Sequence, residues 1–107
     1  MAARTIVNVP ARAKRGDVVE IKALVGHTME TGFRHTESGA VIPRDIIREF
    51  TCTYNGVLVF RAEFHPAIAA NPLVEFSTVA AESGRLQFRW TGDNGFVADA
   101  AAEIAVE

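Results

Sequence analysis

The sequence has few of the features that mark several large classes of protein. It holds one cysteine in 107 residues, which excludes an internal disulfide and leaves the redox compartment open. No apolar run approaches the roughly 20 residues that a membrane-spanning helix requires. No longer apolar segment follows the first residues, so we expect no signal peptide, which taken alone indicates a cytoplasmic protein.

The sequence also lacks an excess of charge of either sign. Eleven Lys and Arg residues stand against 13 Asp and Glu residues, for a formal net charge of −2. A nucleic-acid partner would favour a basic patch, so this balance argues against one. The basic residues Arg4, Arg12, Lys14 and Arg15 do lie near one another in sequence, and we interpret them as charges that keep a strand edge from aggregating.

No long helical period and no internal repeat occur, whereas short strand patterns recur along the chain. The patterns fall at residues 5–10, 19–25, 46–54, 57–65, 74–78, 85–91 and 96–106. About seven short strands with regular turn signals are typical of an immunoglobulin-like antiparallel β-sandwich. We therefore predict one all-β domain over residues 1–107, with Trp90 as a buried core aromatic.

Two stretches interrupt the strand patterns. Residues 27–44 contain Gly32, Gly39 and Pro43 and predict either a long loop or a loose, wide hairpin. A structureless loop of that length is uncommon in a compact domain and is usually functional or mobile. Residues 65–72 contain two prolines and predict a connection with room for one helical turn.

The centre of the chain predicts a hairpin around Asn55-Gly56, because a type I′ turn needs positive φ at both central residues. A two-residue loop fixes the register and places Tyr54, Cys52 and Phe50 on one side. The other side then carries Ile47, Leu58, Phe60 and Phe64. Apolar groups on both sides are unexpected for an antiparallel sheet with one face in water.

An exposed apolar patch of this kind marks an interface, so Ile47, Leu58, Phe60 and Phe64 are predicted to contact a partner. Two alternatives remain open at this point. The stretch 27–44 can fold over this side, or the side can face the opposite sheet and leave the Cys52 side outermost.

The candidates for chemistry do not combine into a site. Cys52 lies within a strand and is interpreted as a small buried hydrophobe, with a redox role as the alternative. A blue-copper site needs two His, one Cys and usually a Met, but no His or Met follows His65. A superoxide-reductase iron site needs four His, and the chain has three. We therefore predict no catalytic residues, no metal and no cofactor.

Several motifs in series resemble one known family. They are His27-Thr-Met-Glu-Thr-Gly32, Ile42-Pro-Arg44, Phe50-Thr-Cys-Thr-Tyr-Asn-Gly56, His65-Pro-Ala-Ile-Ala-Ala-Asn-Pro72, Phe88-Arg-Trp90 and Asp93-Asn-Gly95. Together they resemble SoxZ, the smaller subunit of the SoxYZ carrier of bacterial thiosulfate oxidation. Thr28 stands where the family has proline.

The resemblance implies an immunoglobulin-like sandwich that forms a heterodimer with a SoxY-like subunit. In that family the sulfur-carrying cysteine lies on a flexible Gly-rich C-terminal arm of SoxY. This chain ends in a strand pattern, 101–107, so we expect that it does not carry the substrate covalently. The implied role is to help present the SoxY cysteine to the other Sox enzymes. The resemblance also implies a periplasmic location, reached by export with a signal-bearing partner.

The stretch 27–44 supplies the predicted contacts with those enzymes, through Met29, Glu30, Phe33 and Arg44, because Met suits adaptable surfaces. A mobile surface loop without a partner is the alternative. An isolated subunit can also pair with itself through an unpartnered surface. A different class of function remains open as well, namely a stand-alone immunoglobulin-like module for adhesion or carbohydrate binding.

Overall fold

A computed structural model describes residues 3–107, and strands dominate it. The strands are β1 (Thr5–Asn8), β2 (Arg12–Ala13), β3 (Val18–Val25), β4 (Ile47–Tyr54), β5 (Val57–Glu63), β6 (Leu73–Val79), β7 (Gly84–Gly92) and β8 (Val97–Val106). A short 3₁₀ turn, η1 (Asp93–Gly95), precedes β8. No helix among the described residues is long and apolar enough to cross a membrane.

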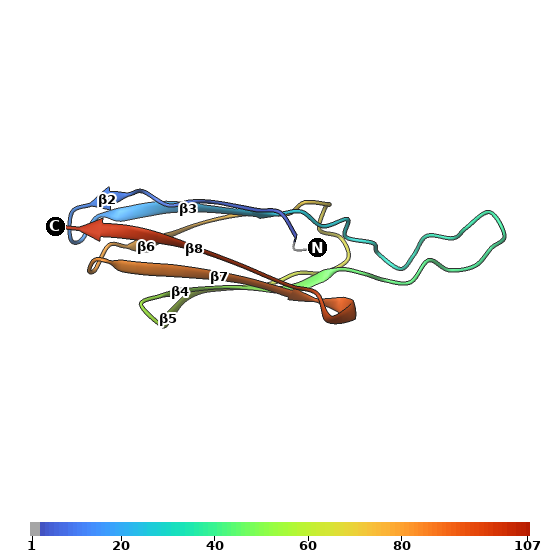
Figure 1. Ribbon diagram of the computed structural model, residues 1–107. Coiled ribbons are helices and arrows are strands. Elements are labelled where there is room, and N and C mark those ends of the chain that lie inside the picture. Colours follow the sequence, from blue (N-terminus) through green and yellow to red (C-terminus); the bar gives the residue numbers. More distant parts are fainter. Residues whose placement is uncertain (1–2) are drawn as a thin grey trace.

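The strands form two sheets. One sheet has the order β1-β3-β6 and the other has the order β2-β8-β7-β4-β5. Every pairing is antiparallel except that of β2 with β8, which is parallel and two residues long. The strands run along the length of the molecule, with the C-terminus at one end (Figure 1). The predicted immunoglobulin-like β-sandwich is confirmed.

Alternation of apolar and polar residues sets the inner face of each sheet. Every second residue of β3 from Val19 to Val25 is buried, and the residues between them face outward. In β7, Phe88 and Trp90 follow the same pattern. Trp90 is fully buried, and its ring centre lies 5.1 Å from that of Phe50. The prediction of Trp90 as a core aromatic is therefore confirmed.

The central hairpin has the predicted turn. Asn55 has φ 49° and Gly56 has φ 82°, as a type I′ turn requires. Tyr54 pairs with Val57, and Thr53 pairs with Leu58, in the predicted register.

The register then shifts by one residue, which the sequence did not reveal. Cys52 pairs with Phe60, so Val59 is an extra residue that forms a β-bulge in β5. Phe60 therefore lies on the same side as Cys52. Its ring stacks on that of Phe76 in the other sheet, with centres 4.4 Å apart and planes 9° apart. The prediction that Phe60 shares a side with Leu58 is wrong because a bulge reverses the faces beyond it.

The predicted apolar outer face also does not exist as one surface. Ile47 and Phe64 are buried in this chain, whereas Leu58 is 54% exposed. The alternative that the Cys52 side faces outward is wrong too, because Cys52 is fully buried. Among Ile47, Leu58, Phe60 and Phe64, Leu58 thus offers the most accessible side chain for the predicted partner contact.

Residues 27–45 form an arm that extends beyond the sandwich (Figure 1, cyan to green). Isolated bridges join Glu30 to Asp45 and His35 to Val41, so the arm is a wide, loose hairpin. The molecule measures 61 × 24 × 18 Å along its principal axes. Of the two forms expected for residues 27–44, a long loop or a loose, wide hairpin, the structure has the hairpin. The alternative that this stretch folds over the central hairpin is wrong (Figure 1).

The connection at residues 65–72 makes a single turn, in which the Ile68 N–H donates to the His65 carbonyl at 3.0 Å. The Asn71 N–H donates to the His27 carbonyl at 2.8 Å, and the His27 N–H donates to Asn71 Oδ1 at 3.0 Å. The connection therefore joins the base of the arm to the sandwich.

The corrected register predicts that Phe60 stabilises the fold. We expect Phe60→Ala to lower the free energy of unfolding by about 2–3 kcal/mol, somewhat less than a fully buried Phe would, because the ring is partly exposed. Leu58→Ala is the control and should cost less than about 1 kcal/mol. Urea denaturation of the two variants checks this expectation, and equal losses would contradict the corrected register.

Candidate partner-binding surface

The base of the arm is fixed by His27, whose side chain is 6% exposed. Its Nδ1 accepts a hydrogen bond from the Met29 N–H at 2.9 Å, so the ring carries its proton on Nε2 when neutral. Nε2 lies 3.6 Å from Asp45 Oδ1, and the ring meets Phe96 edge-on at 4.7 Å. His27 therefore links both sides of the base of the arm to Phe96, the residue before β8.

Met29 lies in the core and not on the surface. The residue is 4% exposed, and its sulfur accepts a hydrogen bond from the Ile47 N–H at 3.3 Å. The backbone takes φ 54° to turn the side chain inward. The reasoning that Met29 provides an adaptable exposed contact is therefore wrong for this chain, because the arm begins with a buried anchor.

Asp93 holds the other strand of the arm. Arg44 donates to its carboxylate twice, from Nε to Oδ2 at 2.8 Å and from Nη2 to Oδ1 at 2.9 Å. The Ile46 N–H donates to Oδ2 at 3.1 Å, and Arg48 Nε lies 3.5 Å from Oδ1. The Arg44 hydrogen bonds are the main reason that the pKa of Asp93 lies below its usual value.

The turn before β8 positions Asp93 by close backbone packing. A Cβ at Gly92 would lie 2.8 Å from the Ile47 Cα, so glycine allows the two strands to approach each other. Sequence reasoning treated Asp93-Asn94-Gly95 as a turn only and missed this role. No spacing rule links Asp93 to Arg44, because 49 residues separate them.

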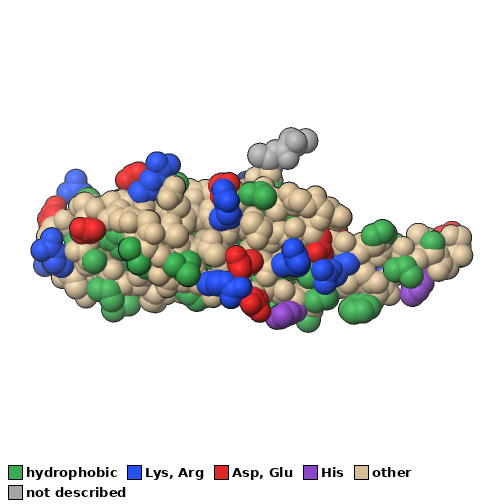
Figure 2. All heavy atoms as spheres, turned by 90° about the horizontal axis from the view of Figure 1, so that it is seen from below, with side chains coloured by type: hydrophobic (Ala, Val, Ile, Leu, Met, Phe, Trp, Pro, Cys, Tyr) green, Lys and Arg blue, Asp and Glu red, His purple; other side chains and the backbone are tan. Residues whose placement is uncertain are grey.

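Beyond these anchors the arm presents apolar side chains. Phe33 is 78% exposed and Val41 is 57% exposed. Glu30 and Arg34 form an ion pair along one strand of the arm, and hydrogen bonding to Arg34 lowers the pKa of Glu30. Apolar side chains lie along the arm, while acidic and basic side chains are mixed over the sandwich on the same face (Figure 2). The structure thus places Glu30, Phe33 and Arg44 on the arm.

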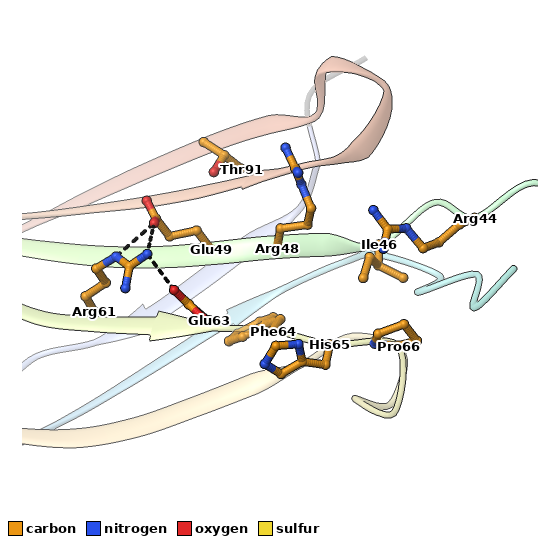
Figure 3. A pocket seen from close by; sticks show the side chains of 10 residues that line it. All are labelled: Arg44, Ile46, Arg48, Glu49, Arg61, Glu63, Phe64, His65, Pro66 and Thr91. Carbon is orange, nitrogen blue, oxygen red and sulfur yellow. Dashed lines mark hydrogen bonds and ion pairs between the residues drawn. The ribbon is translucent and has the colours of Figure 1, made fainter.

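An open hollow of about 470 Å³ lies where the arm meets the end of β5. Figure 3 shows Arg61 between two carboxylates, with His65 and Phe64 nearby. Arg61 donates from Nε to Glu49 at 2.8 Å and from Nη2 to Glu63 at 3.0 Å. Because Arg61 is paired with both carboxylates, the hollow is a polar recess in which these opposite charges are balanced.

Cys52 is sealed from solvent. Burial raises the pKa of its thiol to about 12, so the thiolate that redox chemistry needs is disfavoured near neutral pH. The interpretation of Cys52 as a buried hydrophobe is confirmed. Within residues 3–107, no three or more His, Cys, Asp or Glu side chains are grouped as a metal site would require.

Fold and surface together define an immunoglobulin-like β-sandwich with an anchored, projecting arm (Figure 1). The family model of sulphur oxidation protein SoxZ matches residues 7–103, so the chain belongs to the SoxZ family. Membership places it in a sulfur-oxidation system. No curated protein sequence matches the chain.

Solved structures share the fold at low identity. A superoxide reductase variant from Ignicoccus hospitalis is 20% identical with a TM-score of 0.74, covering 99% of this chain and 82% of its own. A putative superoxide reductase from Thermotoga maritima is 18% identical with a TM-score of 0.74, covering 96% and 85%. The sulfur carrier SoxY from Chlorobium limicola f thiosulfatophilum is 14% identical with a TM-score of 0.67, covering 96% and 79%. These likenesses show the fold alone.

The Asp93 contacts predict that charge at this residue stabilises the base of the arm. Because the folded-state pKa is lowered, the stabilisation is present above the usual Asp value of 3.8 and is lost as the pH falls through the folded-state pKa. We expect Asp93→Asn to lower the free energy of unfolding by about 1–3 kcal/mol at pH 7. The difference from the unsubstituted protein should shrink below about pH 4.

Urea denaturation at pH 7, 5 and 3 measures this difference. Asp99→Asn is a matched control, because Asp99 pairs with Arg89 at 2.7 Å on an exposed surface and should cost less. A loss for Asp93→Asn no larger than that for Asp99→Asn would contradict the anchoring role.

Proposed function

We propose that this chain is the non-catalytic subunit of a heterodimeric sulfur carrier of the SoxYZ kind, acting in thiosulfate oxidation. The SoxZ family match over residues 7–103 carries this proposal. In this proposal the chain pairs with a SoxY-like subunit, which bears the sulfur-binding cysteine, and acts in the periplasm after export with that partner. The fold shared with a solved SoxY carrier supports a partner of the same architecture.

The chemistry of the chain's own thiol supports a non-covalent role. A carrier thiol must reach its enzymes and ionise, and Cys52, the one cysteine of the chain, is fully buried with a pKa raised to about 12. In the proposed complex the sulfur is therefore attached to the partner. This chain contributes binding surface and position.

The arm supports transient contact with the Sox enzymes. Its base is fixed by buried His27 and by the Arg44–Asp93 pair, so its direction is defined before any encounter. Its outer part exposes Phe33 and Val41. Burying a Phe side chain contributes roughly 1.5–3 kcal/mol, which is enough to change a weak affinity by ten- to a hundredfold. In this proposal the arm helps position the enzyme over the cysteine of the partner.

Co-expression with a SoxY-like subunit tests the pairing. We expect the two chains to co-purify in a one-to-one complex through a tag on the SoxY-like subunit, and we expect that complex to accept sulfur. A chain that stays a stable monomer in the presence of that subunit would contradict the proposal and would favour a stand-alone binding module.

The role of the arm gives a further prediction. We expect Phe33→Ala to lower the rate of sulfur transfer from the heterodimer at limiting enzyme by at least about tenfold, through weaker enzyme binding. Glu37→Ala, an exposed change at the tip of the same arm, serves as the control and should leave the rate close to that of the unsubstituted complex. Equal rates for Phe33→Ala and the unsubstituted complex would contradict an enzyme contact at Phe33.

A further inference from the structure

The sandwich has four edge strands, and three of them are protected against pairing with another chain. Exposed edges are usually blunted by short length, bulges or charge. Strand β2 has two residues and pairs with the last part of β8, and the rest of the outer side of β8 lies close to β1. Strand β1 has four residues, with Pro10 two residues after its end. Strand β5 carries the bulge at Val59 and an ion-pair network around Arg61.

Strand β6 is the exception. It has seven residues and pairs with β3 without a register shift. It contains no proline, lysine or arginine, and Glu75 is its one charged residue. The Cα partner of Glu75 in β3 is Lys22, which balances that charge. A regular strand of this length and composition is an open template for another strand.

The backbone groups of β6 that have no partner in β3 can be identified from the alternating direction of N–H and C=O groups along a strand. The Ala80 N–H donates to Asp17 and the Ala80 carbonyl accepts from Gly16, both at 2.8 Å, so Ala80 bonds toward the β3 side. Backbone groups alternate in direction along a strand, so Val74, Phe76 and Thr78 also bond toward β3. The outward residues are therefore Leu73, Glu75, Ser77 and Val79.

An antiparallel strand centred opposite Phe76 would meet all four outward residues. If that strand is equivalent to β6, the Leu73 position faces the Val79 position, and the Glu75 position faces the Ser77 position. This register gives about eight hydrogen bonds and places no two carboxylates opposite each other.

The flanking side chains support the same register. Leu73 and Val79 are 52% and 53% exposed at the two ends of β6. Val18, the Cα partner of Val79 in β3, is exposed beside it. A strand added to β6 would cover apolar surface at both ends while its backbone satisfies the polar groups between them.

We propose that β6 is the edge on which the SoxY-like subunit docks, so that the three-stranded sheet continues across the heterodimer through the equivalent edge strand of the partner. This inference rests on the proposed function. The occupant is argued from the fold, because the solved SoxY carrier shares this fold over 96% of this chain, with a TM-score of 0.67, and is therefore expected to offer an edge strand equivalent to β6. Two sandwiches of one fold can then join through like edges, as in a two-fold pair.

Substitution at Ser77 tests the edge. Ser77→Pro removes one outward N–H and leaves the donors that face β3 in place, a position at which an edge strand tolerates proline. Ser77→Ala is the matched control, because it removes the hydroxyl and keeps the N–H. We expect Ser77→Pro to weaken binding to a tagged SoxY-like subunit at least tenfold, and we expect Ser77→Ala to bind like the unsubstituted chain. The urea midpoint of both variants should stay close to that of the unsubstituted chain.

Amide hydrogen exchange of the unsubstituted chain gives a readout that does not depend on folding of the proline variant. Exchange in a peptide spanning residues 73–79 should slow on complex formation, because the outward amides become hydrogen-bonded. Unchanged exchange there, in a complex that forms, overturns the inference and leaves the proposed function standing. Failure of the unsubstituted chains to associate overturns the proposed function itself.

The isolated chain provides one more outcome. If the isolated chain forms a homodimer through β6 and the SoxY-like subunit displaces the second copy, the inference is supported. The edge then pairs with another strand, and it binds the SoxY-like subunit more tightly than a second copy of this chain. A homodimer through β6 that the SoxY-like subunit does not displace overturns the choice of occupant.

Discussion

Phe60 and Phe50 both pack on Phe76, and these aromatic contacts join the two sheets at one side of the sandwich. Phe60 reaches Phe76 because the bulge at Val59 turns it inward, and the two rings join strands that share no backbone hydrogen bond. Side chains thus close a side that backbone pairing leaves open. The bulge that brings Phe60 inward also blunts the edge of β5, so β6 remains as the regular free edge on that side.

The arm depends on a different set of forces. Few apolar groups hold it, and its direction is set by polar contacts at its two ends, where His27 and Asp93 each join segments far apart in the sequence. Asp93 can hold Arg44 tightly because the carboxylate also accepts the Ile46 N–H, which fixes both its position and its ionised state. The molecule therefore has a body held by apolar packing and an arm held by polar and charged contacts at its base.

The sequence predicted the features that depend on neighbouring residues alone, namely turns and the alternation of buried and exposed side chains along a strand. Asn55-Gly56 predicted a type I′ turn, and the strict alternation of apolar residues around Trp90 predicted which face of that strand is buried. The bulge at Val59 left no pattern, because one extra apolar residue in an apolar strand changes nothing that periodicity can detect. Met29 was misplaced for the opposite reason, since its polar and Gly-rich surroundings indicated a surface loop while a positive φ turns it into the core. The contact of Arg44 with Asp93 depends on chain topology, which spacing does not encode.

The likeness to superoxide reductases shows why fold alone does not assign the chemistry. The backbone matches at a TM-score of 0.74, yet the described residues of this chain group no side chains as a metal site would require. The outside of this sandwich carries an exposed Phe33 on the arm and a regular edge strand, β6. Burial disfavours the thiolate of Cys52 inside the body, which leaves the exposed surfaces as the parts of this chain that a partner can reach.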